Sequence, residues 1–142
     1  MRVLGIDPGE KRIGVAISDP TGTIANPVTV IQHVSRTTDA EAIVRIAEES
    51  MVGKIVVDQS LDEDGNPTPQ GRSAARLVET LRTQTSLSIE LWDESGSTQA
   101  ARAARIAMGA PKKRRGGHLD EIAATYILQT FLDRLSRKID NR

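Results

Sequence analysis

Short apolar runs separated by turns open the chain. The first run, residues 3–6, ends on Asp7, and the proline-glycine pair that follows predicts a turn, because proline fixes φ and glycine accepts positive φ. A second β-rich run covers residues 13–17, so the two runs indicate a hairpin. Residues 23–31 predict a third strand, and Pro27 places it at a sheet edge because proline cannot donate to the ladder.

After these strands the pattern alternates between helix and strand. Thr38 and Glu41 have the spacing of a capping box and predict a helix that begins there. Residues 54–58 form a short, largely apolar strand of the kind that a parallel sheet buries on both faces. A helix is predicted over 70–83 and a fifth strand over 87–92.

Two more helices complete the chain. Ser97 or Thr98 can cap an alanine-rich helix, and the last helix carries a long apolar stripe. The stripe consists of Leu119, Ile122, Ala123, Tyr126, Ile127, Phe131 and Leu135. This order predicts an α/β fold whose five-stranded mixed sheet has three antiparallel strands, then two parallel ones, flanked by helices. The 142 residues predict a single domain over 1–142.

Composition narrows the class of protein. The 19 basic and 19 acidic side chains give zero net charge, which excludes nucleic-acid binding by bulk charge and requires a local patch instead. Cysteine is absent, so disulfides and thiolate sites are excluded. No apolar run approaches the roughly 20 residues of a membrane span, and the N-terminus begins a strand rather than a signal peptide. We therefore expect a cytoplasmic protein with no membrane partner.

Acidic residues close three of the predicted strands. Asp7 ends the first strand, Asp58 the fourth, and Asp93 with Glu94 the fifth. The C-terminal ends of parallel strands open on one side of a sheet, where ligands bind, and Asp120 joins them if the last helix begins at that edge. Clustered carboxylates repel one another unless a cation lies between them. Two Mg²⁺ ions about 3.5–4 Å apart can activate water for phosphodiester hydrolysis, so the acids predict a Mg²⁺ (or Mn²⁺) site.

These residues also carry a family resemblance, in four segments that occur in the expected order. The segments are Asp7-x-Gly9-x-Lys11-Arg12-x-Gly14 with Ser18-Asp19, Ile55-Val-Val with the Leu61…Asp64-Gly65 loop, Asp93-Glu94 with Ser97-Thr98, and Leu119-Asp120 with Ala123-Ala124 and Ile127-Leu128-Gln129. The chain resembles the YqgF family of RNase H-like proteins, described as Holliday junction resolvases and as nucleases that process the 5′ end of pre-16S rRNA. The resemblance implies an RNase H-like fold with Asp7, Asp93 or Glu94, and Asp120 as metal-binding catalytic residues.

The sequence departs from the family pattern twice. Ser95-Gly96 stands where the family usually has an arginine, and loss of that cation would weaken phosphate positioning. Asp58-Gln59-Ser60 replaces the usual Gly-Leu-Pro and adds an acid. Other RNase H-like nucleases hold a carboxylate at the end of this strand, so our hypothesis is that Asp58 is a further metal ligand.

Cationic residues near these acids predict contacts to phosphates, although a charge run more often marks a solvated loop. They are Lys11 and Arg12 in the first turn, and Lys112, Lys113, Arg114 and Arg115 before the last helix. Asp120 also has an explanation other than metal binding, because the helix dipole favours an acid in the first turn of any helix.

Four functions fit these features. The first is a Mg²⁺-dependent nuclease acting on structured RNA, with an rRNA precursor favoured over a DNA junction. The second is a Holliday junction resolvase with the same chemistry. A resolvase needs two symmetric sites, so of the two states expected for this chain, monomer or homodimer, a stable homodimer would favour the resolvase and a monomer would disfavour it. The third is a nucleic-acid-binding module that has lost catalysis. The fourth is an ATP-binding domain of the actin and sugar-kinase type, but such proteins need two domains and this chain has room for one.

Overall fold

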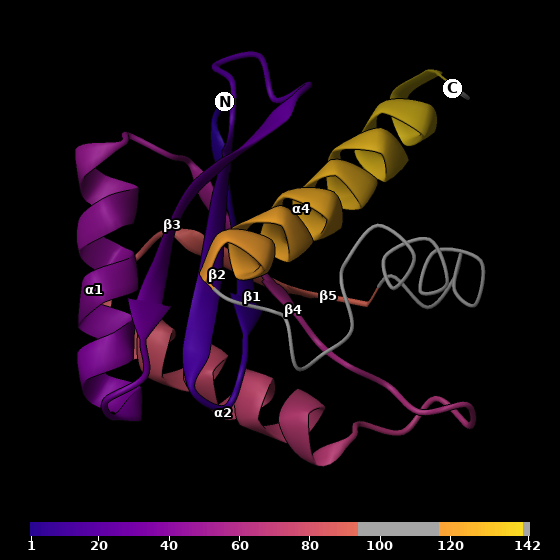
Figure 1. Cartoon of the computed structure of the whole chain (residues 1–142). Coiled ribbons are helices and arrows are strands. Elements are labelled where there is room, and N and C mark those ends of the chain that lie inside the picture. The colour runs from indigo at the N-terminus through magenta and orange to yellow at the C-terminus, as the bar shows by residue number, and fades with distance from the viewer. Residues whose placement is uncertain (94–116, 141–142) are drawn as a thin grey trace.

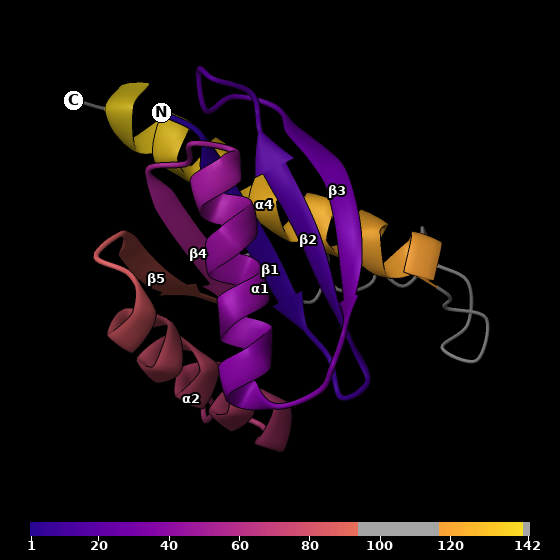
Figure 2. The ribbon, with the colours of Figure 1, turned by 90° about the vertical axis from the view of Figure 1, so that its left-hand side faces the viewer.

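The computed structural model describes residues 1–93 and 117–140, which form one mixed sheet covered by helices on both faces (Figures 1 and 2). In chain order the elements are β1 (Val3–Pro8), β2 (Arg12–Ser18), β3 (Ala25–Gln32), α1 (Arg36–Glu49), β4 (Lys54–Asp58), α2 (Pro69–Gln84), β5 (Ser88–Trp92) and α4 (Gly117–Asp140). Helices α1 and α2 pack on one face of the sheet, and α4 packs on the other.

The strand order is β3-β2-β1-β4-β5, and it confirms the predicted mixed sheet. β1 pairs with β2 and β2 with β3 in antiparallel register, whereas β1 with β4 and β4 with β5 are parallel. β3 lies at the edge of the sheet, as Pro27 predicted, and its register with β2 shifts between Val15 and Ala16. The C-terminal ends of the parallel strands β1, β4 and β5 consequently lie together at one end of the sheet, which is called the C-terminal edge below.

The pleat of β1 divides its side chains between two hydrophobic layers. Leu4 and Ile6 are fully buried against α1 and α2, whereas Val3 packs in the layer formed with α4. Gly5 faces α4 as well, because a Cβ built on it would lie 2.7 Å from the Cβ of Leu128. The absence of a side chain at Gly5 lets α4 approach the sheet closely at this point.

The start of α1 differs from the prediction. The helix begins at Arg36, and its N-cap is Ser35, whose side chain accepts a hydrogen bond from the Thr38 N–H. The predicted start at Thr38 is therefore wrong. Ser35 accepts the Thr38 N–H at this helix end, and Asp39 is buried beneath the preceding loop, so the N-cap is Ser35 rather than Thr38, three residues earlier.

The buried face of α4 also differs from the predicted stripe. Leu135 is 40% exposed, because the C-terminal turns of α4 extend beyond the sheet (Figure 1). The buried residues of α4 include Ala123, Ile127 and Phe131, which confirms that part of the stripe, together with Ala124, Leu128 and Leu132, which were not predicted. The predicted alanine-rich helix after Ser97 lies outside the described residues. Within the described part of the chain, no helix combines the length and apolarity that a membrane span requires.

The loop between β2 and β3 is closed around the carboxylate of Asp19. Its Oδ1 accepts the backbone N–H groups of Thr23 at 2.8 Å and Ile24 at 2.9 Å, and its Oδ2 accepts the Thr21 hydroxyl and N–H. The hydrogen bond from Ile24, followed by those from Thr21 and Thr23, holds the pKa of the Asp19 carboxyl well below its usual range.

This lowered pKa predicts a pH-dependent loss of stability on replacing Asp19 with alanine. The ionised carboxylate stabilises the fold above the unfolded-state pKa of about 3.9, and this contribution is lost as the pH falls from there through the lower folded-state value. The melting temperature of Asp19→Ala should therefore lie below that of the unmodified protein at neutral pH, and the gap should narrow in acid. Thermal denaturation across the acidic range measures this, with Glu63→Ala on an exposed loop as the control. A gap that stays constant down to the lowest pH would contradict the prediction.

Candidate active site

Asp7 and Asp58 occupy corresponding positions on neighbouring strands. Ile6 of β1 pairs with Val57 of β4 in parallel register. The residues that follow them, Asp7 and Asp58, therefore lie at the same level along the two strands. Adjacent strands are about 4.8 Å apart. The two acids that end these strands in the sequence are therefore neighbours at the C-terminal edge of the sheet.

Both carboxylates lie on the α4 face of the sheet. Side chains alternate along a strand, and Gly5, two residues before Asp7, lies against Leu128 of α4. Val56, two residues before Asp58, packs in the same layer as α4. Asp58 is only 8% exposed, whereas Asp7 is half-buried. The pair thus combines a buried carboxylate with one that solvent or a substrate can reach.

Asp93 lies at the same edge, as the first residue after β5. Trp92 pairs with Asp58, and its carbonyl accepts the Gln59 N–H at 2.9 Å, so the β4–β5 ladder continues to the ends of both strands. The Trp92 ring packs edge-on against Phe131 of α4, with 5.4 Å between ring centroids. This contact fixes the end of β5, and with it the backbone position of Asp93, beneath the last helix.

The first turn of α4 is directed toward this edge. Leu128 lies over Gly5 in the middle of β1, and Leu132 borders a cavity together with Val3 at the start of β1, so α4 runs antiparallel to β1 (Figure 1). The preceding turns of the helix therefore extend toward the strand end that carries Asp7. Asp120 lies in the first turn of α4, as predicted, although its side chain is outside the described residues.

The first two predicted phosphate-binding cations lie in the β1–β2 turn and at the start of β2, a few residues after Asp7 in the chain. The Gly9 N–H donates to the Arg12 carbonyl at 2.9 Å, and a Cβ on Gly9 would lie 2.6 Å from that oxygen, so the tight turn requires glycine. Lys11 is exposed at its tip and Arg12 is half-buried at the start of β2. The remaining predicted residues, Glu94 and Lys112, Lys113, Arg114 and Arg115, lie outside the described part of the chain.

The donor set at this edge is compatible with a divalent cation. Mg²⁺ takes one or two protein carboxylates and completes its shell with water and substrate phosphates, and adjacent carboxylates are most stable with a cation between them. Asp7 and Asp58 supply two such oxygen donors on one face. In residues 1–93 and the described side chains of α4, no three His, Cys, Asp or Glu residues are grouped closely enough to hold a metal ion.

Comparison of the chain with known proteins identifies its family. The RuvX family model, described as Holliday junction resolvase, matches residues 1–134. The chain belongs to the RuvX (YqgF) family. This confirms the resemblance found in the sequence.

Two curated relatives are identical to this chain at about two-fifths of the aligned positions. A Clostridium perfringens protein named "Putative pre-16S rRNA nuclease" is 41% identical over 137 residues, which cover 96% of this chain and 100% of the relative. A Paracoccus denitrificans protein of the same name is 39% identical over 133 residues, which cover 94% of this chain and 84% of the relative.

Solved structures share the fold. The Thermus thermophilus RuvC structure in complex with a Holliday junction substrate matches with a TM-score of 0.60 at 17% identity, over 95% of this chain and 96% of that one. The yeast mitochondrial Holliday junction resolvase Ydc2 matches with a TM-score of 0.55 at 11% identity, over 92% and 77%. At these identities the likeness shows the fold alone, and it confirms the predicted RNase H-like architecture.

Sequence reasoning did not single out one buried acid, Asp39. It is 3% exposed, its Oδ1 accepts the Val34 N–H at 3.0 Å, and its Oδ2 contacts Nδ1 of His33. The only local signal was a histidine shortly before a helix whose first turn contains an acid. Asp39 lies on the α1 side of the sheet, on the opposite face from Asp7 and Asp58.

Proposed function

We propose that this protein is a divalent-metal-dependent nuclease that hydrolyses phosphodiester bonds in RNA, with a precursor of 16S rRNA as its substrate. The observation that carries the proposal is the placement of Asp7 and Asp58 side by side on one face of the sheet edge. Membership of the RuvX family supports hydrolysis of nucleic acid, and the names of the curated relatives favour an rRNA precursor. That substrate would place the protein in the cytoplasm, acting as one RNase H-like domain over 1–142.

Each acid has a distinct role in this proposal. Asp7, the more accessible of the adjacent pair, anchors the cation beside the scissile phosphate, and the buried Asp58 provides a rigid second carboxylate. Asp93 or Glu94 and Asp120 complete the set from β5 and α4. Bound Mg²⁺ or Mn²⁺ would activate the attacking water and stabilise the leaving oxygen. Lys11, Arg12 and the cations at 112–115 would hold flanking phosphates and make binding salt-sensitive.

A Holliday junction resolvase is the second candidate, because the matching family model bears that description. The same acids would serve, but cleavage of a four-way junction requires two symmetric sites and hence a homodimer. A binding module without catalysis is the third candidate, favoured by Ser95-Gly96 where the family usually has arginine. It would bind RNA without cleaving it at any metal concentration.

One assay separates the three candidates. The full chain is incubated with labelled 16S rRNA precursor and with four-way DNA junctions, each with Mg²⁺ and with a chelator. Mg²⁺-dependent cleavage of the precursor alone supports the proposal, whereas cleavage of junctions by a protein that sediments as a dimer supports the resolvase. Binding of either substrate without cleavage in Mg²⁺ or Mn²⁺ would leave only the binding module.

The role of Asp58 gives a separate prediction. Asp58→Asn keeps the shape of the side chain but removes its charge, so metal-dependent cleavage should fall by at least about tenfold, with partial recovery at higher Mg²⁺ concentrations. The cleavage rate is measured as a function of Mg²⁺ concentration, beside Asp62→Asn on the exposed loop that follows β4. An unchanged rate and Mg²⁺ dependence would remove Asp58 from the site.

A further inference from the structure

One cavity lies on the opposite face of the sheet from Asp7, close to the same end of β1. It has a volume of about 440 Å³ and is lined by residues of the β1–β2 turn, the start of α1 and the first half of α2. Figures 1 and 2 show these three segments together at one end of the molecule. Its apolar wall includes Pro8, Ile13 and Leu77, and its polar wall includes His33, Arg36 and Ser73. This volume is within the ~300–1,000 Å³ of typical small-molecule sites.

His33 is held in place at the wall of this cavity. Its backbone N–H donates to the Lys11 carbonyl at 2.9 Å, which ties it to the β1–β2 turn, and its Nδ1 contacts the buried Asp39 carboxylate. Because Nδ1 is engaged, Nε2 is the ring atom that a ligand would meet. The Asp39 carboxylate accepts from His33 and from the Val34 N–H, so Arg36 is the donor that these side chains offer to an anion. With Nδ1–H directed at Asp39, Nε2 of His33 is a hydrogen-bond acceptor, and Glu10 is exposed at the rim.

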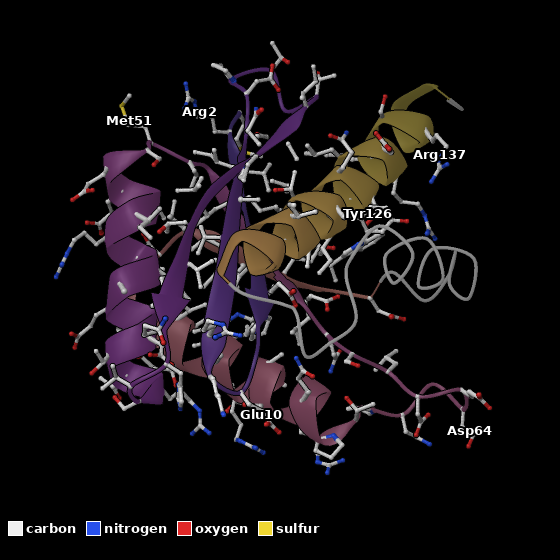
Figure 3. The ribbon with its side chains drawn as sticks, in the orientation of Figure 1. Arg2, Glu10, Met51, Asp64, Tyr126 and Arg137 are labelled. Carbon is white, nitrogen blue, oxygen red and sulfur yellow. The ribbon has the colours of Figure 1, made fainter. Side chains whose placement is uncertain are left out.

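A second cavity of about 230 Å³ adjoins the first. The two share Pro8, Gly9, Glu10 and Ser73, and the second extends to Gln70 at the start of α2. Gln70 is itself fixed to the turn, since its Nε2 donates to the Pro8 carbonyl at 2.6 Å. The two adjoining cavities are together called the groove. Pro8 directly follows Asp7, so the groove lies next to the strand end that carries Asp7, on the other face of the sheet. In Figure 3 side-chain nitrogens gather around the labelled Glu10 at this end of the molecule.

We propose that this groove binds an unpaired nucleotide of the substrate strand outside the cleaved bond, with its base against Ile13 and Leu77, its phosphate on Arg36, and its sugar next to Nε2 of His33. The inference rests on the proposed nuclease function and names its substrate class as strands with unpaired nucleotides beside the scissile phosphate. A cavity of this size admits one splayed-out base, whereas a nucleotide within a duplex keeps its base stacked and presents only its backbone. A fully paired four-way junction would therefore not fill the groove.

Adenosine 5′-monophosphate is the first probe, used with the full chain in a chelator so that no chemistry is needed. Amide NMR shifts of Arg36, His33 and Ser73 should move and saturate on titration. Arg36→Gln should weaken this binding by about tenfold, because it removes a charge-assisted hydrogen bond to phosphate. Arg45→Gln, an exposed arginine later on α1, is the matched control and should bind as the unmodified protein does. Shifts confined to other residues, or equal affinity in Arg36→Gln, would overturn the inference.

A strand is the second probe and distinguishes a nucleotide within a chain from a free mononucleotide. Ser73 is exposed on α2 and borders both cavities, so Ser73→Leu should obstruct the groove without disturbing the core. Fluorescence anisotropy should show about tenfold weaker binding of short single-stranded RNA and unchanged binding of a blunt duplex. Thr83→Leu, exposed near the end of the same helix, is the control. Equal losses for both RNAs, or none, would contradict a groove for unpaired strands.

The two proposals fail separately in these experiments. A protein that binds the nucleotide and the single strand in the groove but cleaves nothing would refute the nuclease and leave the groove. A protein that cleaves precursor RNA but shows no nucleotide contact at Arg36 or His33 would refute the groove and leave the nuclease.

Discussion

Asp7→Asn is expected to abolish metal-dependent cleavage, with a rate loss on the order of 10³-fold. Asp7 is the acid at the centre of the candidate site: on the β4 side it is level with Asp58, and on the β2 side it pairs with Gly14, which carries no side chain. Asparagine has the same size and would preserve the strand end, but it removes the charge that attracts a divalent cation. The rate loss therefore reports on charge rather than on folding.

Single-turnover cleavage of labelled precursor RNA measures this effect, with circular dichroism to verify that the variant is folded. Asp64→Asn is the matched control, because Asp64 is exposed at a loop tip far from β1 in the structure (Figure 3). Contaminating ribonuclease would show itself as activity that survives in Asp7→Asn. Full metal-dependent activity in a purified, folded Asp7→Asn protein would refute the proposed catalytic edge.

Gly5→Ala is expected to destabilise the fold markedly, because it adds a side-chain atom where α4 packs closely on β1. The new Cβ would lie 2.7 Å from the Cβ of Leu128, and neither atom can rotate away because both are fixed to backbone. Overpacking of this kind costs about 2 kcal/mol, which corresponds to a fall in melting temperature of roughly 5–10 °C. Relief of the clash moves α4 away from the sheet, so cleavage should fall as well if Asp120 takes part in it.

The control is Gly53→Ala at the start of β4. There the nearest atoms to a new Cβ are Sδ and Cγ of Met1, the flexible end of a side chain that is 64% exposed, so the protein can adjust at little cost. Thermal denaturation of both variants gives the comparison. Equal melting temperatures for Gly5→Ala and Gly53→Ala would show that α4 does not approach the sheet as closely as the structure indicates.

The sheet was predictable because its strands carry local signals. Asp7, Asp58 and Asp93 each end a short run of β-rich residues, and Pro27 marks an edge strand. The strand positions and the mixed character of the sheet could therefore be predicted before any contact was known. The hypothesis that Asp58 lies with Asp7 followed from the same pattern. The parallel pairing of Ile6 with Val57 then placed the two acids level with each other.

Features that depend on competing local choices were not predictable. Ser35 and Thr38 are both good helix caps, and only the burial of Asp39 under the loop at His33 decided between them. The apolar residues of the last helix allow more than one inward stripe. The close contact at Gly5 selected the one that includes Leu128 and left Leu135 exposed.

By itself the sequence determined the strands, their order along the chain and the acids that end them. These features depend on the alternation of side chains along a strand and on the residue preferences of turns, both of which involve only a few neighbouring residues. Tertiary structure alone decided which face each acid occupies, where α1 begins, how α4 lies on the sheet, and that His33, Arg36 and Ser73 border one groove. These outcomes depend on packing between segments far apart in the chain, and no local pattern encodes that packing.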